Sequence, residues 1–553
     1  MVKQLAEDLR YFIFNKIYGF VVFLAAVCAY GFQVTHVAVG IDDTTMPMYY
    51  AEGLEAVMGR WTLFMLNKII HFSDFAPWMT DLIGVLFLIL AASIWCVLLH
   101  RVFYDEVPFL GYTFFAALFI TCPLISELYV FYLHNGLGVG YVLSALSLLL
   151  VQNALEKDKD IRMCCRNLLA AAFLLVASLG CYESFAIVYA IGALLLFITQ
   201  RTGGNSSRAN VYIKSTWRWG LFSGIPLVVA VLLRGFVVKL ICKVFSLALP
   251  ENFVFGNYRS TFSLFSWNRS ELAMYFKRFW VKFYLNGLVY LPITVLVLGI
   301  GILLIFSVCY GVKKKDVSLP LAAVAIPILP ALMILVEGKE SYYRSCQYVP
   351  LVGAFGVLLL FRAGHRYLRN KAVRCLGVVL AAALLWNQCT DMNRWFYLDY
   401  LKYEYFKDVM ITVFRDLERD YDLSKPIVFG GECPVPYFIV EDASVDVASQ
   451  QFRIIKALGD MVDPHLIEKY IESSGRFYIF AETPVFSTIQ WGITAFDDTS
   501  REIRNFLSMI GYEIRIETDL QKIKDARPLM DSMPHFPYDG YIQEYEDYLI
   551  VHF

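Results

Sequence analysis

Two adjacent carboxylates, Asp42 and Asp43, follow the first long apolar run of the chain, within the sequence VGIDDT. One carboxylate could accept a proton from an attacking hydroxyl group. The other could orient a substrate, or the two could bind a divalent cation such as Mg²⁺ or Mn²⁺. An aspartate followed by two threonines could equally cap a helix. Asp42 and Asp43 are therefore the predicted catalytic residues and a candidate metal site, with a capping role as the structural alternative.

A cationic and an aromatic residue, Arg60 and Trp61, follow the acidic pair in the sequence GRW. They lie on an amphipathic stretch, residues 51–70, and such a stretch is expected to lie along the membrane surface. Arg60 could bind a phosphate through two parallel hydrogen bonds. Trp61 could stack on a sugar, or it could be an aromatic residue at the membrane interface. Both are predicted to bind substrate.

Further polar residues lie in or beside other apolar runs, where charge is costly and is by default a candidate for function. Glu127 ends one run, and Tyr182 and Glu183 interrupt another. Tyr343 and Arg344 precede a third run, and Arg344 is placed to neutralise a phosphate near the membrane surface. Each of the three groups could instead belong to an ordinary charged turn. We expect all five residues to contribute to substrate binding.

The elements that must position these residues are apolar helices. A helix needs about 20 apolar residues to cross the hydrocarbon core of a bilayer. The sequence contains eleven candidate spans, which predict a polytopic α-helical membrane protein. They lie near residues 17–37, 78–100, 108–126, 137–155, 167–181, 183–200, 217–236, 285–310, 317–336, 347–363 and 372–388.

The basic residues of the loops predict the orientation of these spans. One set of loops, together with the N-terminal segment, carries 20 Lys and Arg residues, against 4 in the short loops of the other side. Cytoplasmic loops are the ones enriched in Lys and Arg. The N-terminus is therefore expected in the cytoplasm, and all the candidate site residues are expected on the external face.

The composition separates a membrane part from a water-facing part. Of the 553 residues, 58% are hydrophobic and 18% charged, which excludes a soluble enzyme; the net charge of −1 argues against a nucleic-acid partner. Residues 390–553 contain no spanning run. After a helical stretch near 392–420, strand-like runs at 426–429, 438–440, 476–480, 512–516 and 548–553 alternate with helical patterns near 451–473 and 499–510. We therefore predict a transmembrane domain over residues 1–389 and an extracytoplasmic α/β domain over residues 390–553.

The acidic pair after the first span and the following GRW sequence together resemble the bacterial serotype-converting glucosyltransferases (type II Gtr). The turn at Tyr182–Ser184 resembles the family's tyrosine–glutamine turn, with Glu183 where a glutamine is expected. The stretch KPIVFG after a long amphipathic helix resembles the start of the family's terminal region. The resemblance covers most of the chain and implies a membrane-embedded glycosyltransferase fold of the GT-C type.

The resemblance implies a sugar transferase at the outer face of the bacterial cytoplasmic membrane. The donor would be a hexose, glucose-like, carried on a polyprenyl phosphate, and the acceptor a cell-surface or lipid-linked polysaccharide. An acid of the first external loop, Asp42 or Asp43, would be the general base. A divalent cation could assist, although nothing in the sequence requires a cofactor. The alternative function is a lipid-linked glycan flippase, which would need ionisable residues along a path through the membrane.

Overall fold

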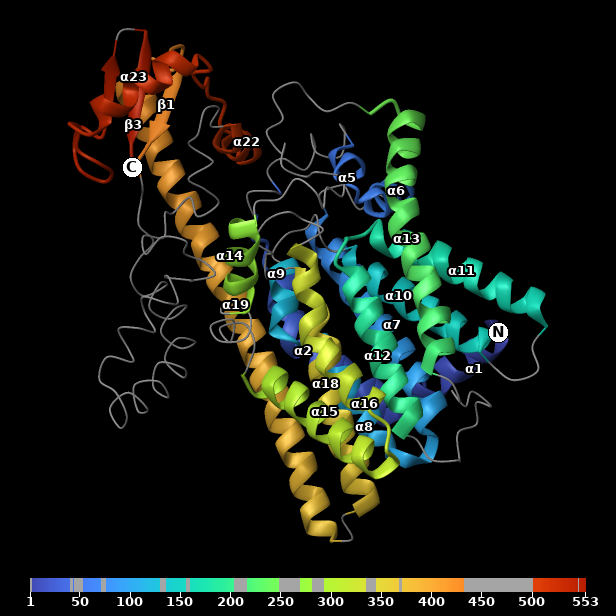
Figure 1. Ribbon diagram of the computed structural model, residues 1–553. Helices are drawn as coiled ribbons and strands as arrows, with labels where there is room; N and C mark the ends of the chain where they lie inside the picture. Colours follow the sequence, from blue (N-terminus) through green and yellow to red (C-terminus); the bar gives the residue numbers. More distant parts are fainter. Residues whose placement is uncertain are drawn as a thin grey trace. The chain divides into compact units, whose positions relative to one another are not determined.

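The computed structural model of the chain divides into two compact units (Figure 1). The membrane unit comprises Met1–Thr35 and Tyr49–Arg394, and the C-terminal unit comprises His36–Met48 and Trp395–Phe553. The predicted domains, residues 1–389 and 390–553, remain a prediction; residues 36–48 belong to the second unit in the structure. The residues that the structure describes are 2–39, 43, 53–70, 76–129, 136–155, 160–202, 216–247, 269–280, 293–334, 345–367, 370–431, 501–545 and 547–553.

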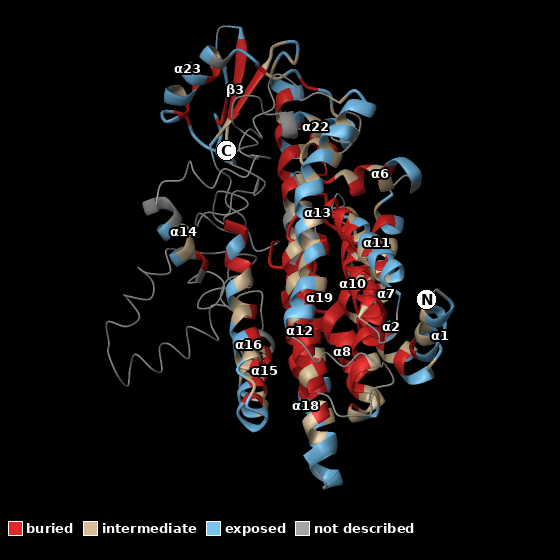
Figure 2. Cartoon of the chain, turned by 45° about the vertical axis from the view of Figure 1, so that its right-hand side comes forward, coloured by how far each residue is buried: buried red, intermediate tan, exposed pale blue. Residues whose placement is uncertain are grey.

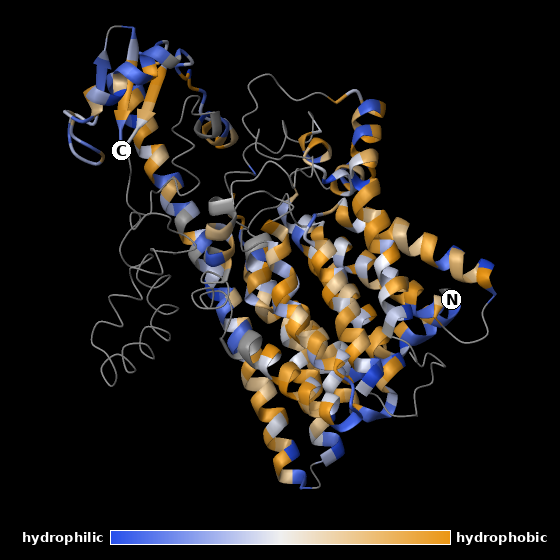
Figure 3. Ribbon diagram, in the orientation of Figure 1, coloured by the Kyte–Doolittle hydropathy of each residue, from blue (hydrophilic) through white to orange (hydrophobic). Residues whose placement is uncertain are grey.

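The membrane unit is a bundle of helices that are mainly hydrophobic along their length (Figure 3). Its elements, in chain order, are α1 (Val2–Ile13), α2 (Lys16–Thr35), α5 (Leu54–Val57), α6 (Trp61–Ile70), α7 (Pro77–Phe103), η1 (Tyr104–Glu106), α8 (Phe109–Ile120), η2 (Pro123–Ile125), α9 (Ser126–Tyr129), α10 (Leu137–Ala154), α11 (Ile161–Leu179), α12 (Phe185–Thr202), α13 (Thr216–Val244), α14 (Arg269–Trp280), α15 (Ile293–Lys314), α16 (Ser318–Ile328), η6 (Leu329–Leu332), α18 (Val349–Tyr367) and the first part of α19 (Lys371–Asp420).

The predicted helical membrane protein is confirmed. Each of the eleven expected spans overlaps helical segments among the described residues. Eight helices among the described residues are long and apolar enough to cross a membrane: α2, α7, α10, α11, α12, α13, α18 and α19. The count of eleven spans remains a prediction. The interrupted run at 167–200 forms two helices, α11 and α12, that meet at a tight turn, and α13 extends eight residues beyond the expected end at residue 236.

Close packing at the centre of the bundle depends on small residues. Figure 2 shows buried residues concentrated in α7, α10 and α12. A Cβ atom at Gly356 would lie 2.5 Å from the Cα atom of Gly299, so only glycine allows α18 and α15 to approach this closely. A Cβ atom at Gly192 would overlap the Trp95 ring in the same way. Membrane helices commonly use small residues at such contacts, because apolar side chains gain little by leaving lipid.

One end of the bundle is held together by buried and half-buried ions. Arg362 is 1% exposed, and its guanidinium donates to Glu106 at 2.9 Å and to the Thr202 hydroxyl at 2.9 Å. The same guanidinium lies 4.4 Å from the centroid of the Phe103 ring. The Arg362 cluster therefore joins α18 to η1, to the end of α7 and to the end of α12.

The C-terminal unit contains a three-stranded sheet in the order β1-β3-β2. Strand β1 (Ile427–Gly430) pairs in parallel with β3 (Tyr548–His552), and β2 (Ile542–Tyr545) pairs antiparallel with β3. The described helices of this unit are the last part of α19, α22 (Arg501–Met509) and α23 (Leu520–Met530). The expected strand at 512–516 is represented by a single bridge from Ile516 to Ile427. The expected elements at 438–440, 451–473 and 476–480 lie outside the described residues.

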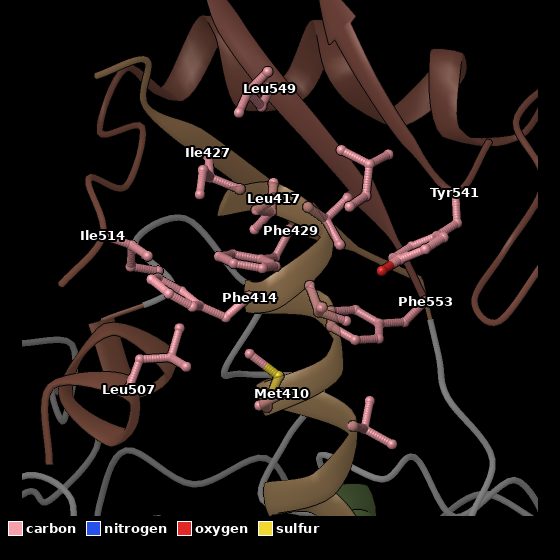
Figure 4. Packing of buried hydrophobic residues seen from close by; sticks show 14 of the residues in the cluster. Met410, Phe414, Leu417, Ile427, Phe429, Leu507, Ile514, Tyr541, Leu549 and Phe553 are labelled. Carbon is pink, nitrogen blue, oxygen red and sulfur yellow. The ribbon is translucent and has the colours of Figure 1, made fainter. Parts of the chain in front are cut away.

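Alternating side chains of the sheet pack against helices on its two faces. Phe429 and Leu549 face a cluster that includes Met410 and Phe414 of α19 (Figure 4). Val428, Ile550 and Tyr548, the alternate residues of β1 and β3, pack with Ala526 and Met530 of α23. Successive strand residues point to opposite faces of a sheet. The described part of this unit is thus a helix–sheet–helix sandwich.

We expect Leu549→Ala to destabilise the C-terminal unit. Leu549 is fully buried, and removing a buried leucine side chain typically costs about 2–5 kcal/mol. The free energy of unfolding can be measured on the full chain in detergent by urea titration with pulse proteolysis. Lys524→Ala, at an exposed position of α23, is the matched control. Equal stabilities of the two variants would contradict the described core.

Candidate active site

A short helical turn followed by a glycine shapes the segment that carries the GRW sequence. Gly53 and Gly59 both have positive φ angles, 66° and 89°, which glycine adopts without a Cβ penalty. Gly59 ends the single turn of α5, and the Arg60 amide then donates to the Glu55 carbonyl at 2.7 Å. The chain reverses here, and α6 begins at Trp61.

A buried carboxylate fixes α5 against α6. Glu55 is 1% exposed, and Asn67 Nδ2 donates to its two carboxylate oxygens at 3.0 and 2.9 Å. A buried carboxylate needs such donors, because leaving it without them costs several kcal/mol. Glu55 is not among the predicted site residues, since nothing in the sequence shows that this acid is buried.

The GRW segment docks on the turn between α11 and α12. The Thr62 amide donates to the Gly180 carbonyl at 2.9 Å, and the Thr62 hydroxyl donates to the Ala177 carbonyl at 2.6 Å. A Cβ atom at Gly180 would lie 2.6 Å from Nε1 of Trp61, so the indole ring packs directly on this glycine. Trp61 is therefore part of a packed contact within the membrane unit.

Four of the predicted site residues come together at this turn. The Arg60 guanidinium lies 4.6 Å from the centroid of the Tyr182 ring, in a cation–π contact. Arg60 is only 6% exposed, and Glu183, which follows Tyr182 in the chain, is 8% exposed. With Trp61 on Gly180, the segment Arg60–Trp61 meets the turn over residues 180–184. The contact thus joins two segments that lie far apart in the sequence.

The structure adds Arg234 of α13, which is not among the residues predicted from the sequence. Its Nη2 atom lies 3.3 Å from Oε2 of Glu183, an ion pair within the apolar bundle. A Cβ atom at Gly59 would lie 2.4 Å from the same Nη2 atom. The sequence signal that could have identified Arg234 is a lone arginine near the end of a long apolar run, because a charge inside a span is costly in free energy.

Several polar groups at this end of the bundle have no hydrogen-bond partner among the described residues. They include Nε1 of Trp61, the hydroxyl of Ser184 and the side-chain amide of Gln347. Ser184 and Gln347 are fully buried. The backbone carbonyl of Gln347 accepts a hydrogen bond from Tyr141 at 2.7 Å, and the Tyr141 ring packs edge-on to Phe185. Buried hydroxyl and amide groups of this kind can bind polar ligand atoms or ordered water.

The other predicted site residues are not brought into this cluster by the part of the chain that the structure describes. Asp42, Tyr343 and Arg344 lie outside the described residues. Glu127 belongs to α9, and its side chain is not among those described. Asp43 is buried and belongs to the C-terminal unit. The described part of the chain has no group of three His, Cys, Asp or Glu side chains that could hold a metal ion, so the divalent cation at Asp42 and Asp43 remains a prediction.

The cluster combines two guanidinium groups, those of Arg60 and Arg234, with the Glu183 carboxylate, all in buried or half-buried positions. Guanidinium groups match the geometry of phosphate oxygens and bind them through parallel hydrogen bonds. In a site shielded from water, such donors also stabilise negative charge that develops on a leaving group. The arrangement around Arg60 and Arg234 can therefore bind a phosphate and stabilise its departure.

We expect Gly59→Ala to destabilise the membrane unit by about 1–3 kcal/mol, since a non-glycine residue at a strongly positive φ costs this much. The new methyl group would also collide with Arg234. Thermal unfolding in detergent, followed by tryptophan fluorescence, measures the change. Gly235→Ala is the matched control, because a Cβ atom there meets no atom within 4 Å. Equal unfolding of the two variants would contradict the described turn.

A comparison with protein families identifies the family to which the chain belongs. The model of the family described as Glucosyl transferase GtrII matches residues 31–361. The matched region includes α5, α6, the turn between α11 and α12, and Arg234. No curated protein and no solved structure matched the chain. Because the match covers more than half of the sequence and agrees with the predicted resemblance, the chain belongs to the Glucosyl transferase GtrII family, a family of membrane glucosyltransferases.

Proposed function

We propose that the protein transfers a glucose-like hexose from a polyprenyl-phosphate donor to a cell-surface or lipid-linked polysaccharide. The reaction would take place at the outer face of the bacterial cytoplasmic membrane. The family match supports glucosyl transfer. The observation that carries the lipid-phosphate donor is the pair of arginines, Arg60 and Arg234, gathered at one end of an apolar bundle. A hydrophobic donor tail would lie in the bilayer while its phosphate reaches these cations.

The proposed reaction is a single displacement at the anomeric carbon. The oxygen of an acceptor hydroxyl forms the new bond, and the bond between the anomeric carbon and the phosphate oxygen breaks. The electron pair of the broken bond leaves with the polyprenyl phosphate. A carboxylate, Asp42 or Asp43, takes the proton of the attacking hydroxyl. Direct displacement would invert the anomeric configuration.

Cationic side chains would stabilise the departing phosphate. Arg60 is proposed for this role from its buried position and charge, and Arg344 from its position in the sequence. The phosphate gains negative charge as the glycosidic bond breaks, so fixed cations bind the transition state more tightly than the donor. A divalent cation at Asp42 and Asp43 could add the same kind of stabilisation. Nothing in the described residues favours the alternative of a glycan flippase.

The proposed orientation places the Arg60 end outside and the Arg362 cluster inside. Helix α12 connects the two ends: Glu183 lies in the turn just before its first residue, Phe185, and Thr202 is its last residue. Its 18 residues span about 27 Å at 1.5 Å per residue, close to the thickness of a hydrocarbon core. Basic residues Arg201, Lys314 and Arg366 accompany Arg362 at its end, as expected for a cytoplasmic face. Because eleven predicted spans from a cytoplasmic N-terminus end outside the cytoplasm, the C-terminal unit is proposed to be extracytoplasmic.

We expect Asp42→Asn or Asp43→Asn to lower the rate of hexose transfer by about 10²–10⁴-fold, because a positioned general base contributes this much. Purified protein is supplied with polyprenyl-phosphate glucose and an acceptor polysaccharide, and the product is followed by mass spectrometry. Asp160→Asn is the matched control, since this exposed residue precedes α11 at the proposed cytoplasmic end. Full transfer by both the Asp42 and Asp43 variants would remove the pair from the mechanism.

We expect a membrane-impermeant maleimide to label Cys165 only from the cytoplasmic side. Cys165 is exposed in the first part of α11, beside basic residues that indicate the inner face. A single-cysteine protein that retains Cys165 is compared in intact cells and in inside-out vesicles. The converse variant, with Lys524→Cys as its one cysteine, should label from outside. Labelling of Cys165 in intact cells would mean that the orientation is inverted.

A further inference from the structure

Arg234 is a charged residue on a helix whose surroundings are otherwise apolar. Its neighbours Leu233, Gly235 and Phe236 are exposed on the surface of α13, where a membrane-spanning helix meets lipid. The Arg234 side chain is only 23% exposed and reaches Glu183 at the turn before α12. An arginine in a span normally faces the interior of a bundle and has a function there. The position of Arg234 therefore indicates a role beyond packing.

The ion pair between Arg234 and Glu183 leaves the guanidinium with spare capacity. The contact is a single one, from Nη2 to Oε2 at 3.3 Å, rather than the parallel pair of bonds that an arginine and a carboxylate can form. Nε of Arg234 is buried and has no partner among the described residues. Since a guanidinium has five N–H donors, the described contacts leave donors for a second anion.

Gly59 brings the second guanidinium into the same neighbourhood. Nη2 of Arg234 lies so close to Gly59 that a Cβ atom there would be 2.4 Å away. The next residue is Arg60, which stacks on Tyr182, and Tyr182 adjoins Glu183 in the chain. Two contacts therefore tie the pair of arginines to one turn: Arg60 to Tyr182, and Arg234 to Glu183.

We infer that Arg234 binds the donor phosphate together with Arg60, and that Glu183 competes with the phosphate for Arg234. This inference rests on the proposed lipid-phosphate donor. Before the donor binds, Glu183 neutralises Arg234, because an unpaired buried cation is costly. When the phosphate arrives, Arg234 exchanges part of its contact with Glu183 for the phosphate oxygens. The exchange stabilises the leaving polyprenyl phosphate more than the donor, because the leaving phosphate carries more negative charge.

If Glu183 competes with the phosphate, substitutions of the two partners of the ion pair should have opposite effects on phosphate binding. Arg234→Gln removes donors to the phosphate and should weaken the binding of polyprenyl phosphate by about tenfold or more, the usual effect of losing a hydrogen bond to a charged group. Glu183→Gln removes the competitor while it keeps the size of the side chain. It should therefore strengthen the binding of polyprenyl phosphate. Arg234→Lys, which retains the charge but loses the planar fork, should lie between wild type and Arg234→Gln.

The experiment measures two quantities on the full chain in lipid nanodiscs. The first is the inhibition constant of polyprenyl phosphate in the transfer reaction, and the second is the KM for polyprenyl-phosphate glucose. Arg366→Gln, which removes an exposed arginine near the other end of the bundle, is the matched control and should leave both quantities unchanged. Thermal unfolding of every variant is recorded alongside, so that a folding defect is recognised.

The outcomes separate this inference from the proposed function. Opposite shifts of the inhibition constant in Arg234→Gln and Glu183→Gln support the competition. Shifts in the same direction, or none in Arg234→Gln, while wild type transfers hexose normally, would show that the pair is structural and overturn the inference alone. A folded wild-type protein that transfers no hexose from the lipid phosphate would overturn the proposed function, and this inference with it.

Discussion

Charge buried inside an apolar bundle is the constraint on which the membrane unit depends. A buried ion is tolerated only where a partner compensates for its lost hydration. The bundle meets this requirement at both ends of α12, with Glu183 and Arg234 at one end and Arg362, Glu106 and Thr202 at the other. The second cluster uses many of the Arg362 donors and joins four elements. The pair of Glu183 and Arg234 uses a single contact. The Arg362 cluster is therefore suited to holding the fold, and the Arg234 pair to binding an anion.

The spans could be predicted from the sequence because their signal is local. About 20 apolar residues are needed for each, and a run of that length is visible without knowledge of its neighbours. Tyr182 and Glu183 were visible for the same reason, as polar residues that interrupt such a run. Arg234 could not be related to Glu183 in this way, since the pairing depends on how α12 and α13 pack. The contacts of Glu55 with Asn67 and of Arg60 with Tyr182 likewise depend on how separate segments pack, which no local pattern reveals.

The C-terminal unit shows where local patterns become ambiguous. Strands β1 and β3 are short apolar runs and were expected nearly where they lie. Strand β2 is buried only at Ile542 and its remaining residues are exposed. It therefore lacks an apolar signature. Helix α23 contains Pro528 near its end, a residue that normally argues against a helix interior. Burial of Ala526 and Met530 against the sheet stabilises the helix despite it.

The family match indicates which part of the chain carries the chemistry that the family shares. It covers residues 31–361 and so includes every predicted site residue, together with Arg234 and Gly59, whereas the C-terminal sheet lies beyond it. Chemistry shared by the family should therefore reside within residues 31–361, which include most of the bundle and the acidic pair. Within the bundle, Gly59 links two requirements, because its positive φ reverses the chain before Arg60 and its missing Cβ makes room for Arg234. One glycine thus allows both guanidinium groups to gather at the turn before α12, and a larger residue there would disturb the backbone and the cation site together.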